Sequence, residues 1–133
     1  MREKPLVLIV DDEEVFLEIA SVKLQASGFE TLLANEVQDA LVKAETCLPD
    51  LVLSDVYMPP GISGFEFALE LRRNPRTREI KIAFFTSLRD PWAELRDNRK
   101  EVMKQLGDVV FFSKTDDVDN LAAGVIALVK KGS

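Results

Sequence analysis

The stretch LVLIVDD (residues 6–12) is a run of five apolar residues that ends in two aspartates. Apolar residues without polar alternation predict a strand that is buried on both faces, as the strands of parallel sheets are. A helical stripe follows, made of Val15, Phe16, Ile19, Ala20 and Leu24. The pair Ser27-Gly28 then predicts the end of this helix, because glycine readily adopts the left-handed conformation that closes helices. This part of the chain therefore predicts one strand–helix unit with an acidic corner.

The same alternation continues to the end of the chain. Further strands are predicted over residues 29–34, 51–54, 80–86 and 109–112. Helices are predicted from an N-cap at Asn35 to Cys47, from a capping box of Ser63 and Glu66 to Leu71, from Asp90-Pro91 to Leu106 with a stop at Gly107, and over residues 118–131. Five such units predict an α/β fold with a doubly wound five-stranded parallel sheet (order 2-1-3-4-5) and helices on both faces, the flavodoxin-like (βα)5 arrangement. We expect one domain over residues 1–133.

The composition limits the classes of function. The chain has 133 residues, 47% of them hydrophobic and 30% charged, which is typical of a globular domain. No apolar run is long enough to span a bilayer and no signal-peptide pattern is present, so we expect a cytoplasmic protein without membrane contact. A net charge of −6 argues against binding to nucleic acid, and the basic cluster Arg72, Arg73, Arg76 and Arg78 is interpreted as a solvated helix end.

Two residue counts exclude further chemistry. The chain has no histidine, so any phosphoryl transfer through histidine must use a histidine of another protein. Its one cysteine, Cys47, excludes an internal disulfide and a cysteine-rich zinc site. Cys47 falls at helical spacing from other apolar residues and is interpreted as a small core residue.

Polar residues follow four of the predicted strands. The first strand ends in Asp11-Asp12, the third in Asp55, the fourth in Thr86-Ser87 and the fifth in Ser113-Lys114. Ligands bind beyond the carboxyl ends of the strands in such sheets, where strands 1 and 3 are neighbours. The three carboxylates should therefore converge. Oxygen ligands without histidine or cysteine favour a hard cation, above all Mg²⁺.

Lys114 and Thr86 add a second element to this site. An ammonium group and a hydroxyl facing the cation are suited to an anion with several oxygens, as in phosphoryl transfer. An aspartate can itself accept the phosphoryl group, and Asp55, which leads into a Pro-rich loop, is the natural acceptor. Each residue alone also has an ordinary structural role: Asp11 and Asp12 as helix caps, Asp55 in an Asx turn, Lys114 as a surface lysine.

At this point the sequence resembles the receiver domains of the response regulators of two-component signalling systems. The matching elements are Val10-Asp11-Asp12-Glu13, Asp55-Val56-Tyr57-Met58-Pro59, Thr86-Ser87 and Lys114, in the order and with the spacing of that family. The resemblance covers essentially the whole chain.

The resemblance implies a role for each matching residue. Asp55 is the phosphoacceptor, and Lys114 and Thr86 contact the phosphoryl oxygens. Asp12 and Asp55 bind Mg²⁺ with the backbone carbonyl of Tyr57, and Asp11 assists through water. The phosphoryl group comes from a histidine kinase or a histidine phosphotransfer protein. Such a domain modifies itself, is not a multiple-turnover enzyme, and switches the contact with an output domain or target protein.

The sequence departs from the family pattern in several places. Thr115 stands where the family has a proline after the lysine, and a trans peptide is therefore expected between Lys114 and Thr115. Phe111 replaces a tyrosine that moves inward on activation. Pro60 is an inserted residue, and the segment 88–98, which includes Trp92, is longer than usual. Trp92 either packs locally or contacts a partner.

Other functions compete with this one. A degenerate receiver that serves as a constitutive protein-interaction module is the main alternative, which Thr115 and Phe111 favour slightly. A flavodoxin-like FMN carrier lacks its phosphate loop here, and an aspartate-nucleophile phosphatase needs Asp-x-Asp on the first strand rather than Asp11-Asp12. The final helix is apolar nearly all round. It either presents a patch for a homodimer or an output contact, or carries alanines that tolerate water.

Overall fold

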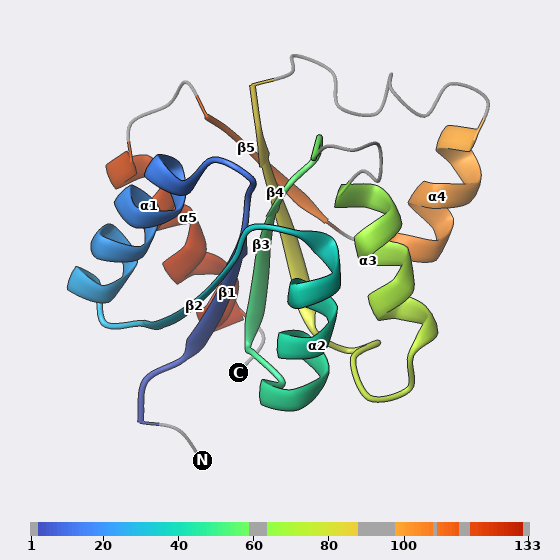
Figure 1. Ribbon diagram of the computed structural model, residues 1–133, viewed down its shortest axis with the longest axis horizontal. Coiled ribbons are helices and arrows are strands. Elements are labelled where there is room, and N and C mark those ends of the chain that lie inside the picture. The colour runs from blue at the N-terminus through green and yellow to red at the C-terminus, as the bar shows by residue number, and fades with distance from the viewer. Residues whose placement is uncertain (1–2, 59–63, 88–97, 108, 115–117, 132–133) are drawn as a thin grey trace.

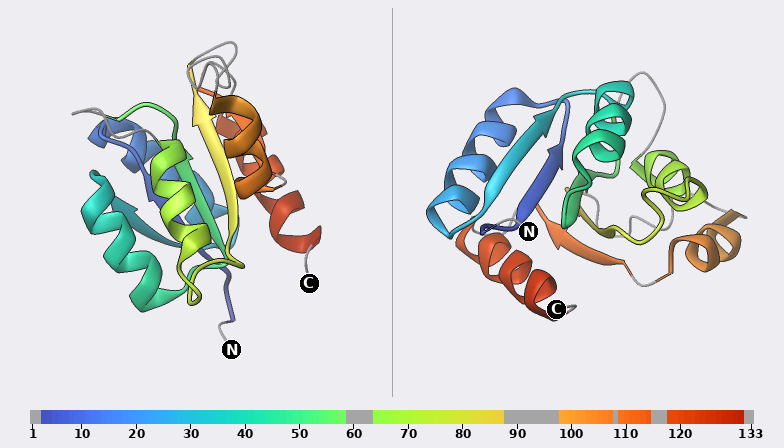
Figure 2. Two further views of the ribbon diagram at one scale, coloured as in Figure 1. Left: turned by 90° about the vertical axis from the view of Figure 1, so that its right-hand side faces the viewer. Right: turned by 90° about the horizontal axis from the view of Figure 1, so that it is seen from below.

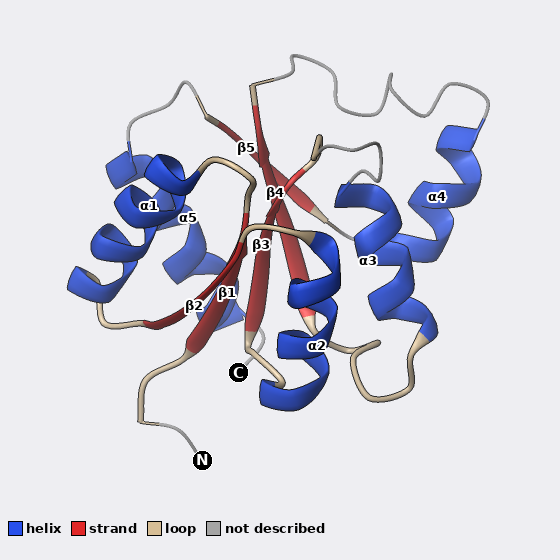
Figure 3. Ribbon diagram, in the orientation of Figure 1, coloured by secondary structure: helices blue, strands red, loops and turns tan. Residues whose placement is uncertain are grey.

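The computed structural model describes residues 3–58, 64–87, 98–107, 109–114 and 118–131. Strands and helices alternate along them (Figures 1 and 3): β1 (Leu6–Val10), α1 (Glu14–Ala26), β2 (Glu30–Ala34), α2 (Val37–Cys47), β3 (Leu51–Asp55), α3 (Gly64–Arg73), β4 (Lys81–Thr86), α4 (Arg99–Leu106), β5 (Val110–Ser113) and α5 (Val118–Lys131). All strand pairs are parallel, and the strand order is β2-β1-β3-β4-β5. This confirms the predicted fold and strand order.

The helices cover both faces of the sheet. Helices α1 and α5 lie on one face, and α2, α3 and α4 lie on the other (Figure 2). Strand β1 feeds both layers, because Val7 and Ile9 belong to the core under α1 and α5, whereas Leu8 and Val10 belong to the core under the other helices. All five residues of β1 are buried, as the unbroken apolar run predicts. Among the described residues, no helix has the length and hydropathy that crossing a membrane requires.

Helix α1 buries Ala20 and Leu24 as predicted, but the rest of the predicted stripe is only partly correct. Val15 and Ile19 were expected in the core but are 70% and 47% exposed. The buried positions include Leu17 and Ser21 instead. Ser21 is tolerated inside because its hydroxyl lies 2.7 Å from the hydroxyl of Thr31 on β2, so its polar group is satisfied. The apolar pattern gave an incomplete prediction because Ser21, a polar residue, is one of the buried positions of α1.

Several predicted helix ends can be compared with the structure. The N-cap of α2 is Glu36, without a side-chain cap hydrogen bond, so the prediction of Asn35 was wrong by one residue. Gly28 and Gly107 both have positive φ, 100° and 71°, and confirm the predicted ends of α1 and α4. The start of a helix at Asp90-Pro91, the capping residue Ser63, Pro60 and Trp92 all lie outside the described residues.

Arg72 is not a solvated helix-end residue, contrary to the prediction. Its side chain is half-buried and donates hydrogen bonds to the carbonyl oxygens of Leu106 at 3.2 Å, Arg78 at 2.9 Å and Ile80 at 2.7 Å. Burial lowers its guanidinium pKa from the ordinary value. Arg72 thus joins the end of α3 to the end of α4 and the start of β4. The other three arginines of the cluster are exposed, as predicted.

The final helix is buried on one face only. Leu121 and Val125 of α5 pack into the core, whereas Ala123 and Ala127 face the solvent. Among the described residues of α5, the exposed apolar side chains are therefore small ones, which favours the interpretation of tolerated alanines. Cys47, at the end of α2, is only half-buried, so its prediction as a core residue holds in part.

Candidate functional site

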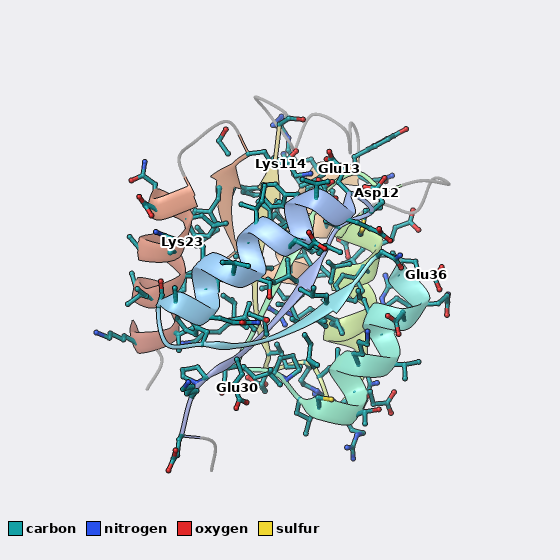
Figure 4. All side chains as sticks on the ribbon, turned by 60° about the vertical axis from the view of Figure 1, so that its left-hand side comes forward. Asp12, Glu13, Lys23, Glu30, Glu36 and Lys114 are labelled. Atoms are coloured by element: carbon teal, nitrogen blue, oxygen red, sulfur yellow. The ribbon has the colours of Figure 1, made fainter. Side chains whose placement is uncertain are left out.

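The carboxyl ends of the strands bring the predicted residues to one edge of the sheet. Val10 of β1 is paired with Ser54 of β3, so Asp11 and Asp55, the next residue of each strand, lie side by side. Asp55 is also paired with Phe85, the residue before Thr86, at the end of β4. Figure 4 shows Lys114, Glu13 and Asp12 together at the N-terminal end of α1.

Three aspartates form an acidic cluster at this edge. One carboxylate oxygen from each of Asp11, Asp12 and Asp55 lies within 4.8 Å of the others. Asp11 is fully buried and Asp55 is 6% exposed, whereas Asp12 faces the solvent. Buried like charges at this separation repel one another strongly unless a cation or a proton is present.

Asp11 has one oxygen that accepts a hydrogen bond and one that is held by an ion pair. Its Oδ1 accepts a hydrogen bond from the backbone N–H of Glu13 at 3.0 Å, so Asp11 also supports the start of α1. Its Oδ2 lies 2.9 Å from Lys114 Nζ, an ion-pair contact without hydrogen-bond geometry, and is a buried atom with no hydrogen-bond partner among the described residues. Burial raises the pKa of Asp11 to about 6, the negative charge of Asp55 adds to the rise, and Lys114 opposes it.

Lys114 follows β5 and is the positive group of the site. Its Nζ lies 2.9 Å from Asp11 Oδ2, 2.9 Å from Glu13 Oε1 and 3.1 Å from Asp55 Oδ2, and its side chain is only 12% exposed. Its backbone N–H donates to the carbonyl oxygen of Thr86 at 2.9 Å, which ties it to the end of β4. Burial alone would lower the pKa of Lys114, but its carboxylate neighbours outweigh burial and raise it.

The ammonium group of Lys114 lies over two aromatic rings. The ammonium group lies 5.0 Å from the ring centroid of Phe16 and 5.3 Å from that of Phe85, a cation–π distance. The rings are stacked with centroids 4.7 Å apart. Sequence reasoning placed Phe16 in the core of α1 and Phe85 in a strand, and missed this role. The available signal was an aromatic residue directly before Thr86 and another in the first turn of α1.

The backbone at Asp55 and Val56 packs closely against the start of α3. The N–H of Gly64 donates to the carbonyl oxygen of Val56 at 2.6 Å, which brings the start of α3 against the end of β3. A Cβ atom on Gly64 would collide with the carbonyl oxygen of Asp55, so this close approach requires glycine. The N–H of Tyr57 lies 3.4 Å from Asp55 Oδ1, and the Tyr57 side chain is 63% exposed. Gly64 was also missed by sequence reasoning.

The donor set suits a hard cation. The cluster offers carboxylate oxygens without histidine or sulfur, which matches the preference of Mg²⁺ for oxygen ligands. The buried Oδ2 of Asp11 is an acceptor left without a hydrogen bond, as expected at the edge of a cation or water site. The residues therefore fit a magnesium ion.

The match to a known family agrees with this geometry. A family model described as the response regulator receiver domain matches residues 7–126. The chain belongs to this family. Receiver domains are signalling domains of two-component systems, and the acidic cluster of this one fits phosphorylation and Mg²⁺ binding.

Curated relatives are longer proteins that share this domain. The receiver domain is 41% identical over 81 residues to the phosphate regulon transcriptional regulatory protein PhoB of Pseudomonas aeruginosa, covering 61% of this chain and 35% of that protein. It is 28% identical over 127 residues to the DNA-binding dual master transcriptional regulator RpaA of Synechocystis sp., covering 96% of this chain and 50% of that protein. The chain thus spans half or less of the length of these relatives.

Solved structures share the fold. The chemotaxis protein CheY4 of Vibrio cholerae matches with a TM-score of 0.79 and 27% identity, covering 93% of this chain and 98% of that one. A CheY-like receiver domain protein of Methanospirillum hungatei matches with a TM-score of 0.81 and 19% identity, covering 97% and 96% of the two chains, and supports the fold alone.

The departures from the family pattern have different outcomes. The ring of the receiver domain's Phe111 is partly buried, stacks on Phe84 with centroids 5.3 Å apart and meets the edge of Phe65 at 6.2 Å. Phe111 therefore packs against the core, and as a phenylalanine it has no hydroxyl group with which to form a hydrogen bond. The peptide between Lys114 and Thr115 lies outside the described residues.

Proposed function

We propose that this receiver domain, spanning residues 1–133, accepts a phosphoryl group on Asp55 and thereby changes its contact with an output domain or a target protein. The observation that carries the proposal is the 3.1 Å contact between Lys114 Nζ and Asp55 Oδ2 beside a buried acidic cluster. A lysine at this distance can compensate the charge that a phosphoryl group brings. The proposed donor is a phosphohistidine of a histidine kinase or a histidine phosphotransfer protein; this histidine must lie on another protein, since the chain has none.

The transfer needs a nucleophile and charge compensation. A carboxylate oxygen of Asp55 attacks the phosphorus, the O–P bond forms as the P–N bond to the donor imidazole breaks, and the freed nitrogen keeps the electron pair and takes a proton from solvent. Lys114 stabilises one phosphoryl oxygen, and Thr86, buried at the end of β4, is the donor to another. Mg²⁺ bound by Asp11, Asp12, Asp55 and the Tyr57 carbonyl would neutralise further charge there.

Burial of Asp55 explains why the cation matters. Burial raises the pKa of Asp55, and Lys114 opposes this rise. The nucleophile must be ionised, so a second positive charge beside the carboxylate favours the reactive form. Hydrolysis by water later returns the Asp55 carboxylate and inorganic phosphate. The domain catalyses only its own modification.

The test is a measurement of intact mass. Wild type and Asp55→Asn are each incubated with acetyl phosphate in two separate samples. One sample contains Mg²⁺, and the other contains excess EDTA in place of Mg²⁺. We expect the wild type to gain the mass of one phosphoryl group with Mg²⁺ and not with EDTA, and Asp55→Asn to gain none. A wild type that stays unmodified, under conditions that modify a receiver of known activity, would contradict the proposal.

A constitutive interaction module is the second candidate. Thr115 after Lys114 and Phe111 in place of tyrosine favour it, because both depart from the pattern of phosphorylation-driven switching. The contact of Lys114 with Asp11 and Asp55 disfavours it. A phosphorylated wild type whose partner affinity is unchanged would favour the module. We further propose a cytoplasmic location and, from the net charge of −6, no direct contact with nucleic acid.

A further inference from the structure

Glu13 contacts the lysine of the site without belonging to the acidic cluster. Its Oε1 accepts a hydrogen bond from Lys114 Nζ at 2.9 Å, across 101 positions of sequence. The metal-binding group consists of Asp11, Asp12 and Asp55 and does not include Glu13. The side chain of Glu13 is 65% exposed, so it approaches the lysine from the solvent side.

The side chain of Glu13 has no role in capping its own helix. Glu13 is the N-cap residue of α1, with extended backbone angles (φ −89°, ψ 103°) and no side-chain cap hydrogen bond. Its carboxylate turns toward β5 instead and meets Lys114 there. The carboxylate of Glu13 is therefore paired with Lys114 and not with the N–H groups of its own helix.

Carboxylates already engage the lysine. Lys114 Nζ donates hydrogen bonds to Glu13 and Asp55 and lies in ion-pair contact with Asp11. Two of these neighbours belong to the proposed reaction site. Phosphorylation of Asp55 introduces new oxygens that need a donor from Lys114. Glu13 is the neighbour that the reaction does not require.

We propose that Glu13 is a positioning residue that holds Lys114 in the unphosphorylated state and is displaced from it when a phosphoryl group arrives on Asp55. The inference rests on the proposed function, because it assigns Lys114 to the phosphoryl oxygens. Contact with Glu13 stabilises the empty site, and its carboxylate repels an anionic phosphoryl group nearby. Glu13 thus lowers the affinity of the site for a phosphoryl group.

The experiment compares two neutralised glutamates. Glu13→Gln removes the charge that pairs with Lys114. Glu14→Gln is the matched control, because it changes the net charge by the same amount, lies in the first turn of α1 and is exposed. Thermal melts confirm that both variants fold. Beryllofluoride, a phosphoryl mimic that binds without reacting, is titrated with Mg²⁺ and followed by ¹⁹F NMR.

We expect Glu13→Gln to bind beryllofluoride about two- to five-fold more tightly than wild type, the range of a half-exposed ion pair, and Glu14→Gln to match wild type. In the metal-free protein, the side-chain ¹⁵N signal of Lys114 should shift in Glu13→Gln and stay in place in Glu14→Gln. This signal reports the lysine contact itself, which a general effect on folding would not move.

Three outcomes would overturn the inference. Equal affinities of the two variants, or weaker binding by Glu13→Gln, would overturn it while leaving phosphorylation of Asp55 intact. An unchanged Lys114 signal in Glu13→Gln would show that the pair is absent in solution. A wild type that does not bind beryllofluoride with Mg²⁺ would overturn the proposed function, and this inference with it.

Discussion

Raising the pH should destabilise the metal-free protein through Asp11. The folded state holds this carboxyl in a buried position, which raises its pKa from 3.8 to about 6. Below about pH 3 the group is protonated in both the folded and the unfolded state, and its burial then has no ionic cost. As the pH rises toward 6, the unfolded chain releases the proton first. The free energy of unfolding therefore falls as the pH rises from about 3.8 to about 6, the pKa of Asp11 in the folded state.

The magnitude follows from the shift. The pKa changes by about 2 units, and each unit corresponds to about 1.4 kcal/mol, so ionised Asp11 costs the folded state about 3 kcal/mol by neutral pH. Asp11→Asn has no proton to release at this position.

The assay is urea unfolding with EDTA at a series of pH values for wild type and Asp11→Asn. The free energy of unfolding of wild type minus that of Asp11→Asn should fall by about 3 kcal/mol between about pH 3 and pH 7. This difference removes the contribution of groups that titrate alike in both proteins. Mg²⁺ should restore much of the loss in wild type only. Parallel pH profiles for the two proteins would refute the reasoning.

Three further substitutions test other contacts. Gly64→Ala should lower stability by about 1–3 kcal/mol in thermal melts and slow phosphorylation, because its Cβ collides with the Asp55 carbonyl oxygen; an unaffected variant would contradict the close approach. Arg72→Ala should cost about 2–3 kcal/mol in urea unfolding, because three carbonyl oxygens lose a charged donor, against about 0.5 for exposed Arg73→Ala; equal losses would exclude the anchoring role. Lys114→Ala should slow phosphorylation by acetyl phosphate about a hundred-fold, and an unchanged rate would remove the lysine from the reaction.

The sheet and the acidic cluster were predictable because their signals are local. An apolar run that ends in aspartate places that aspartate at a strand end whatever the rest of the chain does, as for Val10-Asp11 and Ser54-Asp55. The parallel order then brings distant strand ends together, so the nearness of Lys114 to Asp11 and Asp55 could be expected from topology.

The missed features depend on distances between elements. Periodicity gives a helix several candidate inner faces, and the inner face of α1 includes Ser21, hydrogen-bonded to Thr31, whereas Val15 is exposed. Arg72 was misread because a charged residue at a helix end is usually solvated, whereas here neighbouring carbonyl oxygens converge on it. The pairing of Glu13 with Lys114 joins residues 101 positions apart, and no local pattern encodes it.

The hydroxyl pair between α1 and the edge strand has a consequence for the opposite end of that helix. The hydrophobic effect is non-directional, so a directional polar contact adds to the packing of a helix in fixing its rotation about its axis. The hydroxyls of Ser21 and Thr31 lie 2.7 Å apart, and Gln25 Nε2 donates hydrogen bonds to Ser21 at 3.1 Å and to Thr31 at 3.0 Å. These contacts are directional and therefore help to fix the rotation of α1 about its axis. A slip of one residue would turn α1 by about 100° and carry Phe16 away from Lys114. The position of Phe16 beside Lys114 thus depends in part on a polar contact of Ser21, which lies more than one helical turn farther along α1.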